Sequence, residues 1–197
     1  MTPPRLAPQR TPSQDVETSL LRAADAVLRR DGLAAVTVRA VAAEAGVAPM
    51  GVYSRFGSKD GLVDALLIRA IEDFRSAVAR LEEPDPAERL KAGGRRYREW
   101  ALANDQHYEA IFLARIGLGS AQVAEASMQA FGELLARVEY AMASGVLRQD
   151  DVTEVAQQIW HAVHGAVALE LHSLVLTDDA GATYERLLGT IVRGLAP

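Results

Sequence analysis

The stretch AGVAPMGVYSRFGSKDGL, residues 45–62, combines a sharp turn, a very short helix and several positive charges in a chain of net charge −5. Gly46 can adopt the positive φ that a tight turn requires. Pro49 suits the first turn of a helix, and Gly57 ends that helix. Upstream, Thr37 is a natural N-cap for a helix that ends at Gly46. The stretch therefore predicts two short helices joined by the turn GVAP.

This layout is that of a helix-turn-helix, in which the second short helix enters the major groove of DNA. Val47, Val52 and Phe56 are expected to face inward, against a first helix whose apolar stripe covers residues 20–28. The positions expected to point outward are Pro49, Met50, Gly51, Ser54 and Arg55. The alternative is two surface helices joined by an ordinary turn, because periodicity alone often suggests this motif falsely.

The wider segment TVRAVAAEAGVAPMGVYSRFGSKDGLVDAL, residues 37–66, resembles the DNA-binding region of the TetR family of bacterial transcriptional regulators. The residues that carry the resemblance are Ala45, Gly46, Val47, Tyr53, Phe56, Lys59, Asp60 and Leu62. The resemblance implies an all-helical homodimer, with three N-terminal helices on operator DNA and a larger C-terminal domain that senses a small molecule. The chain departs from the family's pattern at Ala48, where Ser or Thr is common, and at Met50, where Gly is common. The operator sequence therefore cannot be carried over.

Positions matched to the family motif indicate the expected DNA contacts. Thr37, Tyr53 and Lys59 would contact phosphates through hydroxyl and ammonium donors, which fix the register without reading sequence. The outward side of the second short helix would approach base edges, with Met50 against a thymine methyl group. The full set of expected DNA-binding residues is Thr37, Arg39, Pro49, Met50, Gly51, Tyr53, Ser54, Arg55 and Lys59.

Charge is unevenly distributed along the chain. Residues 1–60 carry eight Lys or Arg against six Asp or Glu, whereas residues 61–197 carry thirteen against twenty. The N-terminal part is therefore better suited to bind a polyanion than the net negative charge of the full chain indicates. The chain has no cysteine, which excludes disulfides, thiolate metal sites and cysteine nucleophiles. Its longest apolar stretch, residues 156–176, is interrupted by polar side chains, so no membrane span and a cytoplasmic location are expected.

The chain after residue 14 is predicted to be helical throughout, because apolar residues recur at three- and four-residue steps. The fold class is therefore all-α, with about nine helices. The expected domains are a disordered arm over 1–14, a helix-turn-helix DNA-binding domain over 15–60, and a ligand-binding and dimerisation domain over 61–197. The helices expected in the last domain cover about 62–83, 87–103, 107–115, 123–142, 152–176 and 184–195. Gly93 and Gly94 are expected to loosen the second of these.

Two C-terminal segments, YREWALANDQHYEAIF at 97–112 and WHAVHGAVALELHS at 160–173, look like the C-terminal domain of a TetR subgroup with a Trp…His-Gly motif. The motif residues here are Trp160, His164 and Gly165. The helix expected over 152–176 is apolar almost all round and carries Glu170 as its only charge after residue 156. A helix without a solvent face must be covered on several sides. This eighth helix and the ninth are therefore expected to form a homodimer interface of four helices, as in the family.

Aromatic residues of the fifth, sixth and seventh helices either line a pocket or form plain core. The expected ligand-binding residues are Tyr97, Trp100, Tyr108, Phe112, Met128, Phe131 and His164. The expected effector is an apolar or aromatic small molecule that lowers operator affinity, through the unbroken helix from Leu62 to Glu83. A metal site formed by His161, His164 and His172 is one interpretation. Histidines that are hydrogen-bonded within the core or an interface are favoured, and no metal or cofactor is expected.

No catalytic signature accompanies these features. The sequence GLGS at 117–120 has no strand before it, and no Gly-x-Ser-x-Gly or His-Glu-x-x-His motif occurs. The chain is therefore not expected to be an enzyme, and no catalytic residue is assigned. Two alternatives stay open, an enzyme and a helical dimeric scaffold that binds no operator. Turnover assays would reveal the first, and selection of bound DNA would separate a regulator from the second.

Overall fold

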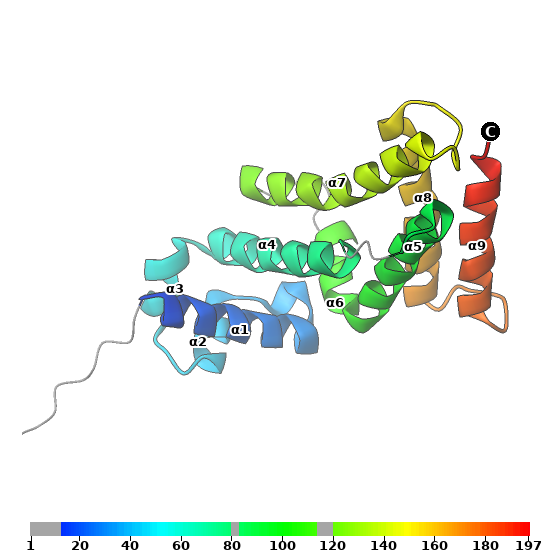
Figure 1. Cartoon of the computed structure of the whole chain (residues 1–197). Helices are drawn as coiled ribbons and strands as arrows, with labels where there is room; N and C mark the ends of the chain where they lie inside the picture. The colour runs from blue at the N-terminus through cyan, green and yellow to red at the C-terminus, as the bar shows by residue number, and fades with distance from the viewer. Residues whose placement is uncertain (1–12, 80–82, 114–119) are drawn as a thin grey trace, which may run out of the picture. The chain divides into compact units, whose positions relative to one another are not determined.

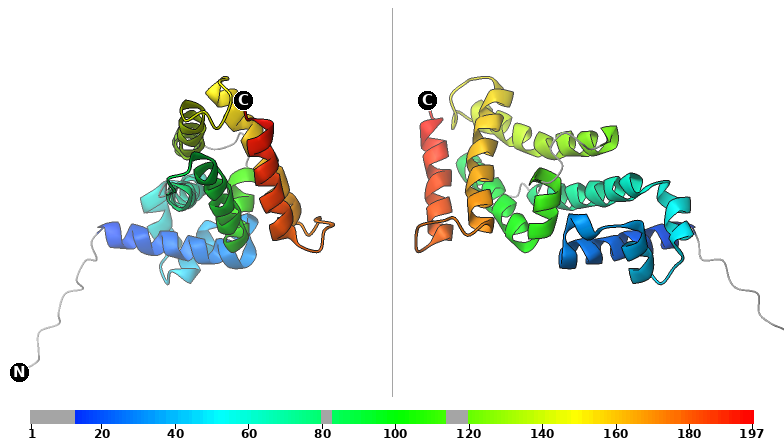
Figure 2. Two further views of the ribbon diagram at one scale, coloured as in Figure 1. Left: turned by 45° about the vertical axis from the view of Figure 1, so that its right-hand side comes forward. Right: turned by 180° about the vertical axis from the view of Figure 1, so that it is seen from behind.

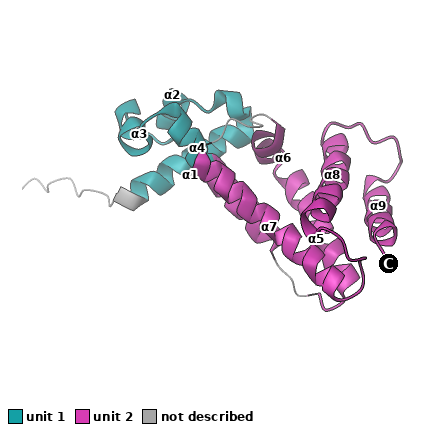
Figure 3. Ribbon diagram, turned by 90° about the horizontal axis from the view of Figure 1, so that it is seen from above, with its two compact units in different colours: residues 1–66 teal, residues 67–197 magenta. Residues whose placement is uncertain are grey.

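The computed structural model describes residues 13–79, 83–113 and 120–197, and within these ranges the chain is all-helical, with nine α-helices and no strand (Figure 1). The expected all-α fold class is confirmed. The chain divides into two compact units, one ending at Leu66 and the other beginning at Leu67 (Figure 3). The expected disordered arm lies outside the described residues except for Ser13 and Gln14, with which the first helix begins.

The first unit is built on four helices and a short 3-10 turn. Its elements are α1 (Ser13–Asp31), η1 (Leu33–Ala35), α2 (Val38–Glu44), α3 (Pro49–Phe56) and the beginning of α4 (Lys59–Val78). Helix α2 packs on α1 and α3. The core between them holds fully buried side chains from every helix: Leu20, Leu28, Val41, Val52 and Leu62. Burial of these apolar side chains is what fixes the short helices, which would be marginal in isolation.

Local chemistry sets the limits of α2 and α3. The Thr37 hydroxyl accepts a hydrogen bond from the Ala40 amide at 3.1 Å, which caps α2 as predicted. Gly46 has φ +67° and Gly57 has φ +72°, a left-handed conformation that side chains disfavour. The Ser58 hydroxyl accepts from the Gly61 amide at 3.0 Å and caps α4. The predicted helix-turn-helix layout is confirmed.

The second unit consists of the rest of α4 and the helices that follow it. These are α5 (Pro86–Ala103), α6 (Asp105–Tyr108), the π-helix η2 (Glu109–Leu113), α7 (Ala121–Ala143), α8 (Val152–Leu171) and α9 (Ala180–Gly194). Helix α5 packs on α7, α8 and α9, and α9 runs back alongside α8 (Figures 1 and 2). None of the helices in the described ranges combines the length and the apolar run that crossing a membrane requires.

Two predicted helices are too long. Helix α4 ends at Val78, not Glu83, and the Val78 carbonyl accepts a hydrogen bond from the Arg137 guanidinium. Helix α8 ends at Leu171, not Leu176, because Ser173 takes a left-handed φ of 57° and the Leu174 amide bonds back to the Leu169 carbonyl at 2.8 Å. The expected helix over 107–115 instead begins at Asp105 and widens into η2, and its last two residues lie outside the described ranges.

The glycine pair of α5 lies within a continuous helix, and its loosening effect stays a prediction. A Cβ atom on Gly94 would lie 2.6 Å from Leu188 Cδ2, and one on Gly93 would lie 3.0 Å from Arg137 Nε. The Tyr184 hydroxyl of α9 also donates to the Gly94 carbonyl at 2.8 Å. The two glycines therefore allow α7 and α9 to approach the α5 backbone closely.

Candidate functional site

Helix α3 is held by one buried residue and presents several exposed ones. Val52 is fully buried, whereas Met50 is 72% exposed and Tyr53 is 47% exposed. Pro49 occupies the first turn, and Ala48 at the N-cap accepts no hydrogen bond through its side chain. The helix therefore offers a row of free side chains on a backbone that the core holds in place.

The residues expected to contact DNA all belong to the first unit and differ in exposure. The exposed ones are Arg39, Pro49, Met50, Tyr53, Ser54 and Lys59, and the half-buried ones are Thr37, Gly51 and Arg55. Val47, expected to face inward, is 40% exposed, so that expectation is wrong. Its position in the turn, ahead of α3, directs it away from the core that Val52 enters.

The cations around α3 are not equivalent. Arg39 and Lys59 have no ion-pair partner among the described residues and are free to contact phosphates. The Arg55 guanidinium lies 4.0 Å from the Glu17 carboxylate, a long and partly exposed pair that contributes little to stability. The Ser54 hydroxyl donates to the Gly51 carbonyl at 3.0 Å, so its lone pairs stay available as acceptors.

The second unit contains a cavity of about 500 Å³, within the usual size range of ligand sites. It is lined by residues of α4, α5, η2, α7, α8 and α9, and its walls are mainly apolar. Aromatic rings pack edge to face around it, with Phe74 and Phe112 centroids 5.8 Å apart and Phe131 and Trp160 centroids 5.9 Å apart.

Four of the residues expected to bind ligand line this cavity: Tyr97, Phe112, Met128 and Phe131. Trp100 and Tyr108 do not line it and are buried in the core. The Trp100 indole N–H donates to the Asp73 carboxylate at 2.9 Å, so the polar atom of this buried side chain has a hydrogen-bond partner. The aromatic periodicity of α5 could not distinguish wall from core, since both kinds of position face inward.

His164 does not line the cavity and contacts two buried tyrosines, one of which, Tyr97, does line it. Its Nδ1 lies 2.8 Å from the Tyr97 hydroxyl and 2.7 Å from the Tyr108 hydroxyl. Burial, with a smaller effect of His161, lowers the pKa of His164 and favours the neutral ring, whose tautomer sets whether Nδ1 donates to a phenol or accepts from one. Burial also raises the pKa of Tyr97 far above its ordinary value and that of Tyr108 to about 12. The three side chains form a neutral hydrogen-bonded cluster.

Sequence reasoning missed several cavity residues, above all Arg137, Trp160 and Lys91. A signal for Arg137 was present, because it falls three residues after Leu134 and four before Ala141, on the apolar stripe of α7. The Arg137 side chain is buried at 4% exposure. In the described ranges no three His, Asp or Glu side chains gather to hold a metal ion, and this includes the three histidines of the C-terminal part.

One face of α8 is exposed and carries few polar groups. Val155, Ala156, Ile159, Val163 and Val167 point into the core. His161, Gly165 and Leu169, spaced four residues apart, are exposed instead, and a Cβ atom on Gly165 would meet nothing within 4 Å. Ala166 is half-buried and packs against the core of the second unit. The stripe His161–Gly165–Leu169 is therefore an exposed surface of α8 without a charged side chain.

Comparison with known proteins assigns both units. Residues 20–66 match the family described as "Bacterial regulatory proteins, tetR family", and residues 90–191 match "Tetracyclin repressor-like, C-terminal domain". An uncharacterised HTH-type transcriptional regulator of Mycobacterium tuberculosis, Rv0681, is 24% identical over 93% of this chain and 83% of its own length.

Two solved structures share the fold. A protein of unknown function from Rhodococcus sp. RHA1 superposes with a TM-score of 0.86 at 24% identity, covering 98% of this chain and 100% of its own. The TetR family regulator PfmR of Thermus thermophilus superposes with a TM-score of 0.66 at 21% identity, covering 91% and 99%. At these identities the two structures support the fold and say nothing of effector or operator.

Proposed function

The chain belongs to the TetR family of DNA-binding transcriptional regulators, and from this membership we propose that it is a repressor that an effector releases from its operator. A homodimer binds a palindromic site, and a small apolar or aromatic molecule in the cavity lowers its affinity for that site. The division of labour follows the expected domains, with DNA binding in residues 15–60 and effector binding and dimerisation in 61–197. The family acts by binding DNA and performs no catalysis, so the enzyme alternative is set aside.

The observation that carries the DNA-binding role is the opposite exposure of neighbouring residues on α3. Val52 anchors the helix in the core while Met50 and Tyr53 stay free. We assign Met50, with Pro49, Gly51 and Ser54, to base edges in the major groove. Thr37, Arg39, Tyr53 and Lys59 are assigned to phosphates, and Arg55 serves either role.

We propose that the dimer forms through α8 and α9. The exposed stripe His161–Gly165–Leu169 lacks charge, and the glycine leaves room for the backbone of a partner helix. A twofold dimer presents two α3 helices, which fits a palindrome with half-sites about 10 base pairs apart or a multiple of that.

Effector control is proposed to run through α4. Ile71, Phe74 and Val78 of this helix line the cavity, and the same helix begins at Lys59, next to the expected DNA contacts. An effector that favours one position of α4 changes operator affinity by its preference for that state, typically about 1–3 kcal/mol.

Selection of bound sites from a random DNA pool by the purified protein tests the proposal. We expect enrichment of a single palindrome, and the α3 variant Met50→Ala should shift its preferred bases. A pool that stays random after several rounds would favour the helical scaffold. An enriched site without twofold symmetry would argue against the dimer.

A further inference from the structure

Arg137 lines a cavity whose walls are mainly apolar. Its side chain is buried, and two of its nitrogens donate to main-chain carbonyls, Nη1 to Glu133 at 3.0 Å and Nη2 to Val78. The Nε atom is buried and has no hydrogen-bond partner within the described residues. Of the five N–H donors of this cation, at least the Nε–H therefore has no acceptor in the described part of the chain.

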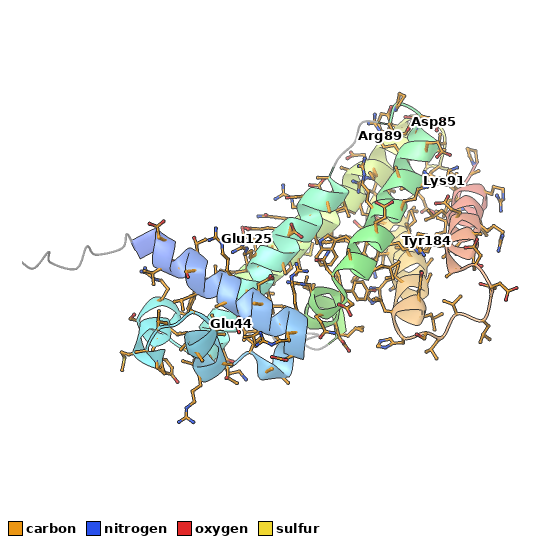
Figure 4. The ribbon with its side chains drawn as sticks, turned by 90° about the horizontal axis from the view of Figure 1, so that it is seen from below. Glu44, Asp85, Arg89, Lys91, Glu125 and Tyr184 are labelled. Atoms are coloured by element: carbon orange, nitrogen blue, oxygen red, sulfur yellow. The ribbon has the colours of Figure 1, made fainter. Side chains whose placement is uncertain are left out.

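Arg137 also has little compensation of its charge among the described residues. Within the described ranges no carboxylate forms an ion pair with it. Glu133, whose charge acts favourably on Arg137, is bound to Arg75 at 3.1 Å. Arg89 and Arg96 add repulsion, and buried Nη1 of Arg96 likewise has no partner in the described residues. Figure 4 shows Arg89 with Lys91 on α5, and Lys91 is already paired with Glu88. This end of the cavity is therefore positive.

A buried guanidinium without a counter-ion is costly, because neutral carbonyls replace only part of its hydration. Burial lowers the pKa of Arg137 to about 10, so the side chain stays cationic at neutral pH. A purely structural role, capping the end of α4 through the Val78 carbonyl, accounts for one nitrogen. It accounts neither for the open Nε donor nor for the placement of the charge at the cavity.

We propose that the effector is an amphipathic anion, in which a carboxylate head pairs with Arg137 and an apolar or aromatic body fills the cavity. This inference rests on the proposed function only in calling the ligand an effector, since binding itself needs no DNA. An Arg–carboxylate pair is charge-assisted and directional, and it is strongest where water is excluded. The aromatic wall formed by Phe74, Phe112 and Trp160 receives the body of the ligand.

Gly93 supports the same assignment, since it makes the space that the guanidinium occupies. A Cβ atom there would lie 3.0 Å from Nε and 3.1 Å from Cδ of Arg137. The variant Gly93→Ala therefore displaces the guanidinium while the positive charge remains in the chain. It provides a second way to perturb the site if removal of Arg137 prevents folding.

The experiment is calorimetric titration of the full-length protein, without DNA, with octanoate, decanoate, 4-phenylbutyrate and 1-naphthoate, each compared with its primary amide. The acid and amide of a pair share the apolar body and differ in charge. We expect at least one acid to bind, and to bind at least tenfold more tightly than its amide. Arg137→Met should remove this preference while leaving amide affinity within about threefold. The control Arg148→Met removes an exposed cation that pairs with Asp150 and does not line the cavity, so it should preserve the preference.

Equal affinities for acid and amide in the unmodified protein would overturn the proposal, as would failure of every acid to bind. A preference retained in folded Arg137→Met would also overturn it. Should that variant not fold, Gly93→Ala decides, with loss of the preference expected and its persistence contradicting the assignment. These results are independent of the DNA selection, so an acid-selective cavity in a protein that selects no DNA would refute the proposed function alone.

Discussion

Met50 and Lys59 illustrate how neighbouring residues of one interface serve different purposes. Met50 stands free on α3, and Lys59 begins α4 without an ion-pair partner in the described residues. We expect Lys59→Ala to weaken binding to all DNA sequences alike, because a phosphate contact carries no base information. The magnitude of the log–log salt slope of binding should fall by about 0.9 for each subunit. Fluorescence anisotropy at several salt concentrations measures both effects.

Met50→Ala is the matched variant, with the opposite signature. It should leave the salt slope unchanged and alter which bases are preferred at one position of each half-site. The assignment of roles would be reversed if Lys59→Ala changed base preference and Met50→Ala changed the salt slope.

Protonation of His164 is expected to make the free energy of unfolding depend on pH. Burial lowers its pKa in the folded chain, whereas the unfolded chain has the ordinary value near 6.5. As pH falls through about 6.5, the unfolded chain therefore binds the proton first, and the free energy of unfolding decreases. His164→Gln should flatten this slope in urea titrations between pH 7.5 and 5.5. His172→Gln, in the exposed turn after α8, is the control and should keep it. A slope unchanged in His164→Gln would contradict a neutral, half-buried ring.

At the scale of elements, the sequence predicted the features that depend on neighbouring residues and did not predict those that depend on tertiary packing. The limits of α2 and α3 were predictable because Thr37, Gly46, Pro49 and Gly57 act on their own neighbourhood. The end of α8 was not, since Ser173 gives no sequence signal for a left-handed residue. For the candidate sites the same distinction holds. Family motifs indicated the exposed side of α3, whereas the cavity depends on how six elements pack.

The close contact of α5 and α9 gives an element-scale prediction. Gly94→Ala would place a Cβ atom 2.6 Å from Leu188 Cδ2, and the resulting overpacking should cost about 1–3 kcal/mol of the free energy of unfolding. Gly132→Ala on α7 is the matched control, because its Cβ atom would meet nothing within 4 Å. This change should stabilise the protein by roughly 0.5–1 kcal/mol through helix propensity. Urea denaturation measures both, and equal effects would show that Gly94 is not at a tight contact.

At the scale of the whole molecule, the proposed dimer depends on the exposed stripe of α8. Leu169 is 50% exposed on that stripe, and Leu169→Glu would bury an unpaired carboxylate in the interface. We expect monomers in sedimentation velocity and a loss of operator affinity, because one α3 helix alone contacts a single half-site. Leu102→Glu changes a leucine that is 38% exposed on α5 and should leave the dimer intact. A dimer unaffected by Leu169→Glu would place the interface elsewhere.

The boundary between Leu66 and Leu67 also has a use in engineering. Every expected DNA contact, from Thr37 to Lys59, precedes it, and every cavity-lining residue, from Ile71 to Val192, follows it. Under the proposed function, a gene fusion joined at this point in α4 would change the DNA site that is recognised and keep the residues that line the cavity. Such a fusion would be a transcriptional biosensor. Residues 1–66 would determine which promoter, and so which reporter gene, is controlled, and residues 67–197 would determine which molecule is detected.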